Sequence, residues 1–143
     1  LIPGNILSGK SIFGVVGNVV AGKRFAIIEV WSSSNMSSFT YTNGATKNWY
    51  VLTASGLAFK PTTIFCKYAV IDDGVGSEYI TFYEEDAYNL YPKSVKLATF
   101  GEGLGGGNSE NFKGDAGAAT VYNGGFTLPA RKPVTKYICY CYE

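Results

Sequence analysis

The side chains of this chain best suited to contact a ligand are tyrosines in a polar stretch. Tyr88 and Tyr91 follow acidic residues, in surroundings where a fully buried ring is less expected. Tyrosine rings stack on sugars, and neighbouring carboxylates and amides hydrogen-bond to hydroxyl groups. We therefore predict a ligand-binding surface built from residues 79–91 and part of residues 101–117. Its predicted contact residues are Tyr83, Tyr88, Tyr91, Glu85, Asp86, Asn89, Asn108 and Asn111. The alternative is that most of these rings fill the core.

The sequence gives less support to a catalytic function. The chain has no histidine, which excludes Ser-His-Asp and Cys-His nucleophiles and histidine-ligated zinc. A glycosidase needs two carboxylates about 5–10 Å apart, and a hairpin could bring Asp72 or Asp73 to Glu84 or Glu85. Nothing distinguishes these residues from solvated turn residues, and Asp72-Asp73-Gly74 lacks the alternating oxygen ligands of a calcium loop. We expect no catalytic residue, no metal and no cofactor.

The three cysteines, Cys66, Cys139 and Cys141, are an odd number, which argues against a disulfide framework. Cys139 and Cys141 lie two apart on one predicted strand, beyond disulfide reach of each other. Cys66 would have to lie directly opposite one of them. We predict three free, buried thiols.

Composition and pattern predict the fold class. The 143 residues have a net charge of +1 and 16% charged residues, which indicates one globular domain with no electrostatic footprint for nucleic acid. No apolar run is long enough to span a bilayer. Alternating patterns occur over 24–31, 63–71, 78–84 and 134–142, the first apolar on both faces, and Asn43-Gly44 is a strong hairpin signal. Without a helical stripe, these patterns predict an all-β fold, an antiparallel β-sandwich of jelly-roll-like type.

Two glycine-rich segments differ from the rest. Residues 1–22 hold apolar pairs separated by glycines, and we predict that they form a stalk or linker before a recognition domain at 23–143. Residues 101–117 are expected to be a long flexible loop. The chain begins with Leu and shows no signal-peptide pattern, so we expect it to be the C-terminal part of a longer protein.

Three segments resemble the C-terminal domains of phage and prophage tail fibre and baseplate proteins. Residues 5–18, NILSGKSIFGVVGN, resemble a segment that precedes the globular domain in that family. Residues 56–64, GLAFKPTTI, resemble the opening of the domain. Gly125-Phe126-Thr127-Leu128-Pro129 and the aromatic strand 137–142 resemble its ending, although the cysteines at 139 and 141 depart from the family pattern.

This resemblance implies a non-enzymatic receptor-binding domain at the tip of a tail fibre or baseplate. It would recognise a bacterial surface glycan or surface protein, contact other tail proteins, and be assembled in the host cytoplasm but act extracellularly. We expect a homotrimer with contacts in residues 5–20, and neither nucleic-acid binding nor membrane insertion. The alternatives are a structural capping or assembly domain without a ligand and a fragment of a polysaccharide depolymerase.

Overall fold

The computed structural model describes residues 2–18, 22–72, 75–86, 93–101 and 108–143. Within these residues the only helical turn is η1 (Pro3–Asn5), and no helix is long and apolar enough to cross a bilayer. The strands are β1 (Ser11–Ile12), β2 (Val15–Val16), β3 (Phe25–Tyr41), β4 (Thr46–Ala54), β5 (Thr63–Asp72), β6 (Val75–Glu84), β7 (Ser94–Gly101), β8 (Asn108–Gly117), β9 (Thr120–Tyr122), β10 (Gly125–Ala130) and β11 (Lys136–Tyr142). The predicted all-β class is confirmed.

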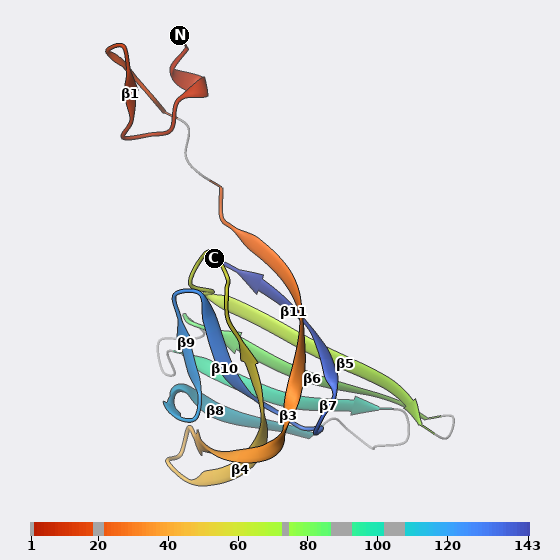
Figure 1. Ribbon diagram of the computed structural model, residues 1–143. Helices are drawn as coiled ribbons and strands as arrows, with labels where there is room; N and C mark the ends of the chain where they lie inside the picture. Colours follow the sequence, from red (N-terminus) through yellow and green to blue (C-terminus); the bar gives the residue numbers. More distant parts are fainter. Residues whose placement is uncertain (1, 19–21, 73–74, 87–92, 102–107) are drawn as a thin grey trace.

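The strands form an antiparallel sheet that closes into a barrel-like ring. The hydrogen-bonded order is β11-β5-β6-β7-β8-β3, and β11 also pairs with β3, which closes the ring. Strands β4, β10 and β9 continue outward from β3 and lie in front of β6 and β7 in the view of Figure 1. Because β5 to β8 form a consecutive meander, the connectivity differs from the expected jelly roll.

Strand β3 serves two parts of the sheet. Its first half pairs with β11, and its second half pairs with β4 and touches β8. Between Ser32 and Met36 the register against β4 shifts by two residues. Short hydroxyl side chains replace the interrupted ladder there, since Val51 N–H donates to Ser33 Oγ (2.9 Å) and Ser32 Oγ donates to the carbonyl of Lys132 (2.7 Å). The polar run 32–35 therefore supplies hydrogen-bonding partners at the point where the strand bends.

The core fills the space between the ring and the β4–β10 layer. Its largest fully buried side chains are Tyr83, Tyr137, Phe39, Phe112, Phe126, Leu52, Ile64, Leu97 and Leu128. One buried polar bond crosses it, from the Thr81 hydroxyl on β6 to the carbonyl of Pro129 on β10 (2.7 Å). Pro129 lies past the end of β9, on an open edge of β10 where its missing N–H costs no ladder bond. Thr81 thus ties the two layers together.

The glycine-rich segment 101–117 is more ordered than predicted. Asn108–Gly117 is strand β8 and pairs with β7, so the expectation of a flexible loop over this part is wrong. A Cβ on Gly114 would lie 2.5 Å from the carbonyl oxygen of Lys93 and 2.7 Å from the Tyr83 ring. This glycine lets β8 pass close to the core, a packing role that composition does not reveal.

Cys66 and Cys139 form a disulfide, which overturns the prediction of three free thiols. The register places them directly opposite each other on β5 and β11, while Cys141 lies opposite Ile64 and keeps a buried thiol. The sequence argument against a Cys139–Cys141 bridge holds. It failed for Cys66 because the register between strands 73 residues apart cannot be read from their spacing.

Residues 2–18 form a separate small hairpin beyond the start of β3 (Figure 1). Ile6 is its buried apolar residue, and Gly17 passes so close to the Ile6 backbone that a Cβ would lie 2.2 Å from its carbonyl oxygen. Leu7, Ile12 and Val16 are exposed. The predicted boundary at residue 22 stays a prediction, as does the stalk role of this segment.

Candidate functional site

Tyr83, a leading predicted ligand contact, lies in the core. Its ring is 1% exposed, and its pKa is raised, chiefly by burial. It pairs with Ile64 on one side and Val95 on the other, on the inward face of β6. The prediction that Tyr83 contacts a surface ligand is therefore wrong, because period-two alternation does not say which face of a strand turns inward.

The neighbouring predicted residues differ in their surroundings. Glu85 forms an ion pair with Lys60, and its backbone N–H donates to the carbonyl of Thr62 (2.8 Å). Asp86 is exposed. Tyr88, Asn89 and Tyr91 lie outside the described residues, so their role stays a prediction.

The asparagines of the predicted site lie on β8. Asn108 is opposite Thr99 and Asn111, which is exposed, is opposite Lys96, whereas the 85–93 connection meets the other end of β7 at Ser94. Ser94 and Thr99 are five residues apart along the strand, roughly 17 Å. The structure therefore does not bring Asn108 together with Glu85 and Asp86 into one site.

The carboxylate pair considered for glycosidase chemistry is also separated. Glu84 lies opposite Thr63, and Asp72 lies opposite Val75 at the other end of the β5–β6 hairpin. These positions are nine residues apart along the strands, about 30 Å, far beyond the spacing that two catalytic carboxylates need. In the described part of the chain no three Cys, Asp or Glu side chains cluster in a way that could hold a metal ion.

Several exposed aromatic side chains lie together on the outer face of β3 and β11. We call this surface the β3–β11 face; it comprises Phe25, Ile27, Glu29 and Trp31 from β3 and Lys136, Ile138, Tyr140 and Tyr142 from β11. Trp31 is 63% exposed. Beside it, Lys136 Nζ lies 3.0 Å from Glu29 Oε1. The face combines a free indole with charged hydrogen-bonding groups, an arrangement suited to a polar ring-shaped ligand.

A hollow of about 350 Å³ adjoins this face, where β5 continues past the start of β11. It is lined by Lys67, Tyr68, Lys136 and Ile138, and Lys136 is the direct neighbour of Trp31. Lys67 lies over the Tyr140 ring (6.0 Å) and forms no ion pair with any carboxylate that the structure describes. The hollow therefore offers positive charge beside an exposed tryptophan.

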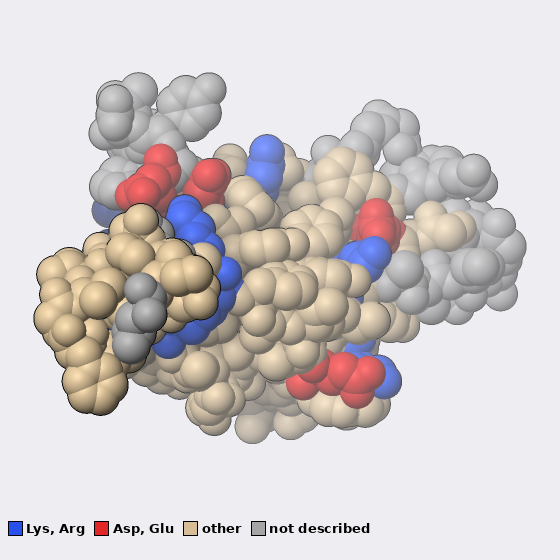
Figure 2. Space-filling model, turned by 90° about the horizontal axis from the view of Figure 1, so that it is seen from above, with Lys and Arg blue, Asp and Glu red and all other residues tan. Residues whose placement is uncertain are grey.

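Sequence reasoning missed this face. An apolar pattern on both faces of 24–31 predicts a strand buried on both sides, yet its outward residues Phe25, Ile27 and Trp31 are exposed, so that prediction is wrong for one face. The apolar alternation on both faces was the available signal. Seen from the end that carries both termini, the surface shows charges of both signs in small groups around a broad uncharged area (Figure 2).

Trp49, by contrast, is covered by its neighbours. Lys47 and Arg131 lie over its ring at 4.6 and 5.0 Å, and Glu110 forms ion pairs with both cations. The hydroxyl of Tyr41 donates to the same carboxylate, and burial together with this hydrogen bond raises the pKa of the tyrosine. This cluster links β3, β4 and β8 to the end of β10. Because Lys47 and Arg131 lie over the Trp49 ring, this ring is not a free surface on which a ligand could stack.

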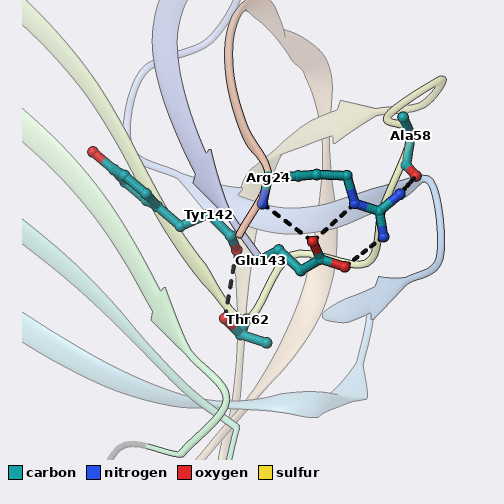
Figure 3. Close-up of polar contacts among 5 residues, drawn as sticks. All are labelled: Arg24, Ala58, Thr62, Tyr142 and Glu143. Carbon is teal, nitrogen blue, oxygen red and sulfur yellow. Dashed lines mark hydrogen bonds and ion pairs between the residues drawn. The ribbon is translucent and has the colours of Figure 1, made fainter. Parts of the chain in front are cut away.

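An ion pair joins the start of β3 to the last residue. Arg24 Nε lies 2.8 Å from Glu143 Oε2, and the guanidinium also donates to the carbonyl of Ala58 (Figure 3). Hydrogen bonds from Arg24 lower the pKa of the Glu143 carboxyl to about 2. The backbone is fastened nearby, since Thr62 N–H donates to the carbonyl of Tyr142 (2.8 Å).

Comparison of the chain with protein-family models, curated proteins and solved structures finds no match.

Proposed function

We propose that this chain is a non-enzymatic receptor-binding domain of a phage-like tail fibre or baseplate, acting as a homotrimer on a bacterial surface glycan. The resemblance of residues 5–18, 56–64 and 125–142 to such proteins supports the assignment. A closed antiparallel barrel supports it as a rigid scaffold for a recognition surface. A disulfide suits a domain that acts outside the cell, where such bonds persist.

The observation that carries a glycan ligand is the exposed Trp31 beside Glu29, Lys136 and the lysine-lined hollow. An indole ring stacks on the apolar face of a sugar, and the charged groups bind its hydroxyls. Lys67 and Lys136 favour a glycan that carries negative charge, such as a uronate or phosphate group. Each site binds weakly, and several copies on one tail raise the avidity by about 10²–10⁴.

The test measures binding of the purified full chain to a panel of bacterial surface glycans. Trp31→Ala should weaken binding of the selected glycan by about 5- to 150-fold, as for a central aromatic contact. Lys67→Gln should weaken only binding of charged glycans and reduce its salt dependence. Phe100→Ala, another exposed aromatic but on β7, is the matched control and should leave binding unchanged.

Two alternatives give different results in the same experiment. A structural capping or assembly domain, favoured by the exposed apolar side chains of the N-terminal hairpin, would bind no glycan selectively. A depolymerase fragment would release reducing ends from bacterial polysaccharide. If Trp31→Ala still binds the glycan and Tyr88→Ala does not, the ligand site lies instead on the surface predicted from residues 79–91.

A further inference from the structure

The sheet is split between β3 and β4. Their pairing ends at Ser32 opposite Leu52, after which β4 continues along β10 and the first half of β3 continues along β11. A groove runs between the separated strands. One part, of about 470 Å³, lies between residues 28–31 and 53–55, and a second, of about 340 Å³, lies between residues 24–28 and 56–59. Ile28 lines both parts, so the two parts adjoin at this residue.

Among the residues that the structure describes, no strand pairs with the backbone edges on either wall of the groove. Glu143 N–H donates to Arg24 C=O and Ser32 N–H to Thr135 C=O, both at 2.9 Å, so the even-numbered residues of this half of β3 face β11. The N–H and C=O groups of the odd-numbered residues 25, 27, 29 and 31 therefore point into the groove. On β4, the bond from Tyr41 N–H to Ala45 C=O shows that odd-numbered residues face β3. By the same alternation, Thr53 and Ser55 face the groove.

The floor of the groove is apolar and incompletely covered. Val30, on the inward face of β3, is 5% exposed, yet Ala26 and Ile28 on the same face are only half-buried. Ala54 and Phe59 form the opposite part of the floor. At one end the Arg24 guanidinium reaches across to the Ala58 carbonyl (Figure 3). Unpaired edges above an apolar floor are the features of a sheet from which a strand is missing.

The same chain carries a hairpin that lacks a core. In residues 5–18, Leu7, Ile12 and Val16 are exposed, and Phe13 at the hairpin tip is 94% exposed with a left-handed backbone (φ 49°). A phenylalanine in that conformation costs about 1–2 kcal/mol, and the described residues leave its ring almost fully exposed, so burial of the ring does not offset this cost. Apart from Lys10, this segment has no charged side chain, so little charge would be desolvated when it enters an apolar groove.

We propose that the N-terminal hairpin (residues 5–18) of a second copy of this chain docks in the β3–β4 groove and extends the sheet along the free edge of β3. Its apolar side chains cover Ala26 and Ile28, and Lys10 lies near Glu29, a carboxylate at the rim of the groove that also pairs with Lys136. The hairpin lies beyond the start of β3 and leaves its own groove open (Figure 1). Donation from one copy to the next is a heterologous contact, and such contacts form a closed ring, such as a trimer, when the rotation between successive copies closes.

The test separates backbone pairing from side-chain packing at one position. Ile27 N–H faces the groove, so Ile27→Pro removes no bond to β11 but blocks an added strand. Ile27→Thr keeps the N–H and a strand-forming side chain and is the matched control. In sedimentation equilibrium the full chain should show a multiple of 15.4 kDa. Ile27→Pro should weaken association at least tenfold, and Ile27→Thr much less.

Two further measurements complete the test. Phe13→Asn, which tolerates a positive φ, should weaken association while the thermal midpoint of the barrel stays unchanged. Amide exchange should show that the N–H groups of Ile27, Glu29 and Trp31 are protected in the assembled protein and become unprotected on dilution to the single chain, whereas Ile28 stays protected by β11.

Several outcomes would overturn the proposal. A single-chain mass for the unmodified protein would do so, as would full association of Ile27→Pro. Protected odd-numbered amides in a single chain would show that the hairpin fills its own groove instead. The inference is independent of the glycan: loss of glycan binding in Trp31→Ala with association intact concerns the proposed ligand site only.

Discussion

Reduction of the Cys66–Cys139 disulfide should cost this domain a large part of its stability. The bridge joins residues 73 apart in the sequence. A loop of that length corresponds, in the chain-entropy treatment of the unfolded state, to about 4 kcal/mol at 25 °C. Single domains are stable by only about 5–15 kcal/mol in total, so the reduced protein should be close to the limit of folding.

Urea unfolding of the oxidised and the reduced protein measures this effect without any substitution. With a denaturant dependence of about 2 kcal/mol per molar, the urea midpoint should fall by about 2 M on reduction. The double variant Cys66→Ala/Cys139→Ala is the control, because its midpoint must not respond to the reductant. Cys141→Ala should retain the response, since this thiol takes no part in the bridge.

Two results would refute the reasoning. The first is an intact mass under non-reducing conditions that corresponds to three thiols, instead of a mass lower by two hydrogen atoms. The second is an identical midpoint for the oxidised and the reduced protein, which would mean that the pairing of β5 with β11 already restricts the unfolded chain as much as the bridge does.

Three further predictions concern single side chains. Cys141, fully buried with its thiol pKa raised to about 11 by burial, should resist alkylation in the native protein and react once urea unfolds the chain; native labelling would contradict its placement. Thr81→Val leaves the buried carbonyl of Pro129 unpaired and should lower the free energy of unfolding by about 1–3 kcal/mol, seen as a lower urea midpoint, whereas an unchanged midpoint would mean that this bond adds nothing. The Glu143 carboxyl should titrate near pH 2 by NMR, so its stabilising contribution is complete above about pH 4.5 and is lost as the pH falls toward 2. In Arg24→Met the carboxyl should titrate near its ordinary value, and an unaltered titration would exclude Arg24 as the cause.

The sequence alone predicts the class of the fold because alternation and turn chemistry are local. Period-two patterns mark most of the long strands, and Asn43-Gly44 lies in the turn between β3 and β4, where Gly44 has a positive φ and Asn43 Oδ1 accepts a bond from Ala45 N–H (3.0 Å). These signals depend on neighbouring residues, which keep the same relations in any β fold.

Tertiary structure decided the register between distant strands, which face of each strand is buried, and which strand edges remain open. Cys66 lies opposite Cys139 because β5 pairs with β11. Tyr83 points inward because the barrel of strands closes on that side of β6. An alternating strand has two equivalent faces in its pattern, so only packing against distant strands determines which face is buried. The serine-rich bend separates the first half of β3 from β4 and so opens the groove, while Trp31 remains on the surface. Both outcomes depend on contacts between β3 and residues about one hundred positions further along the chain.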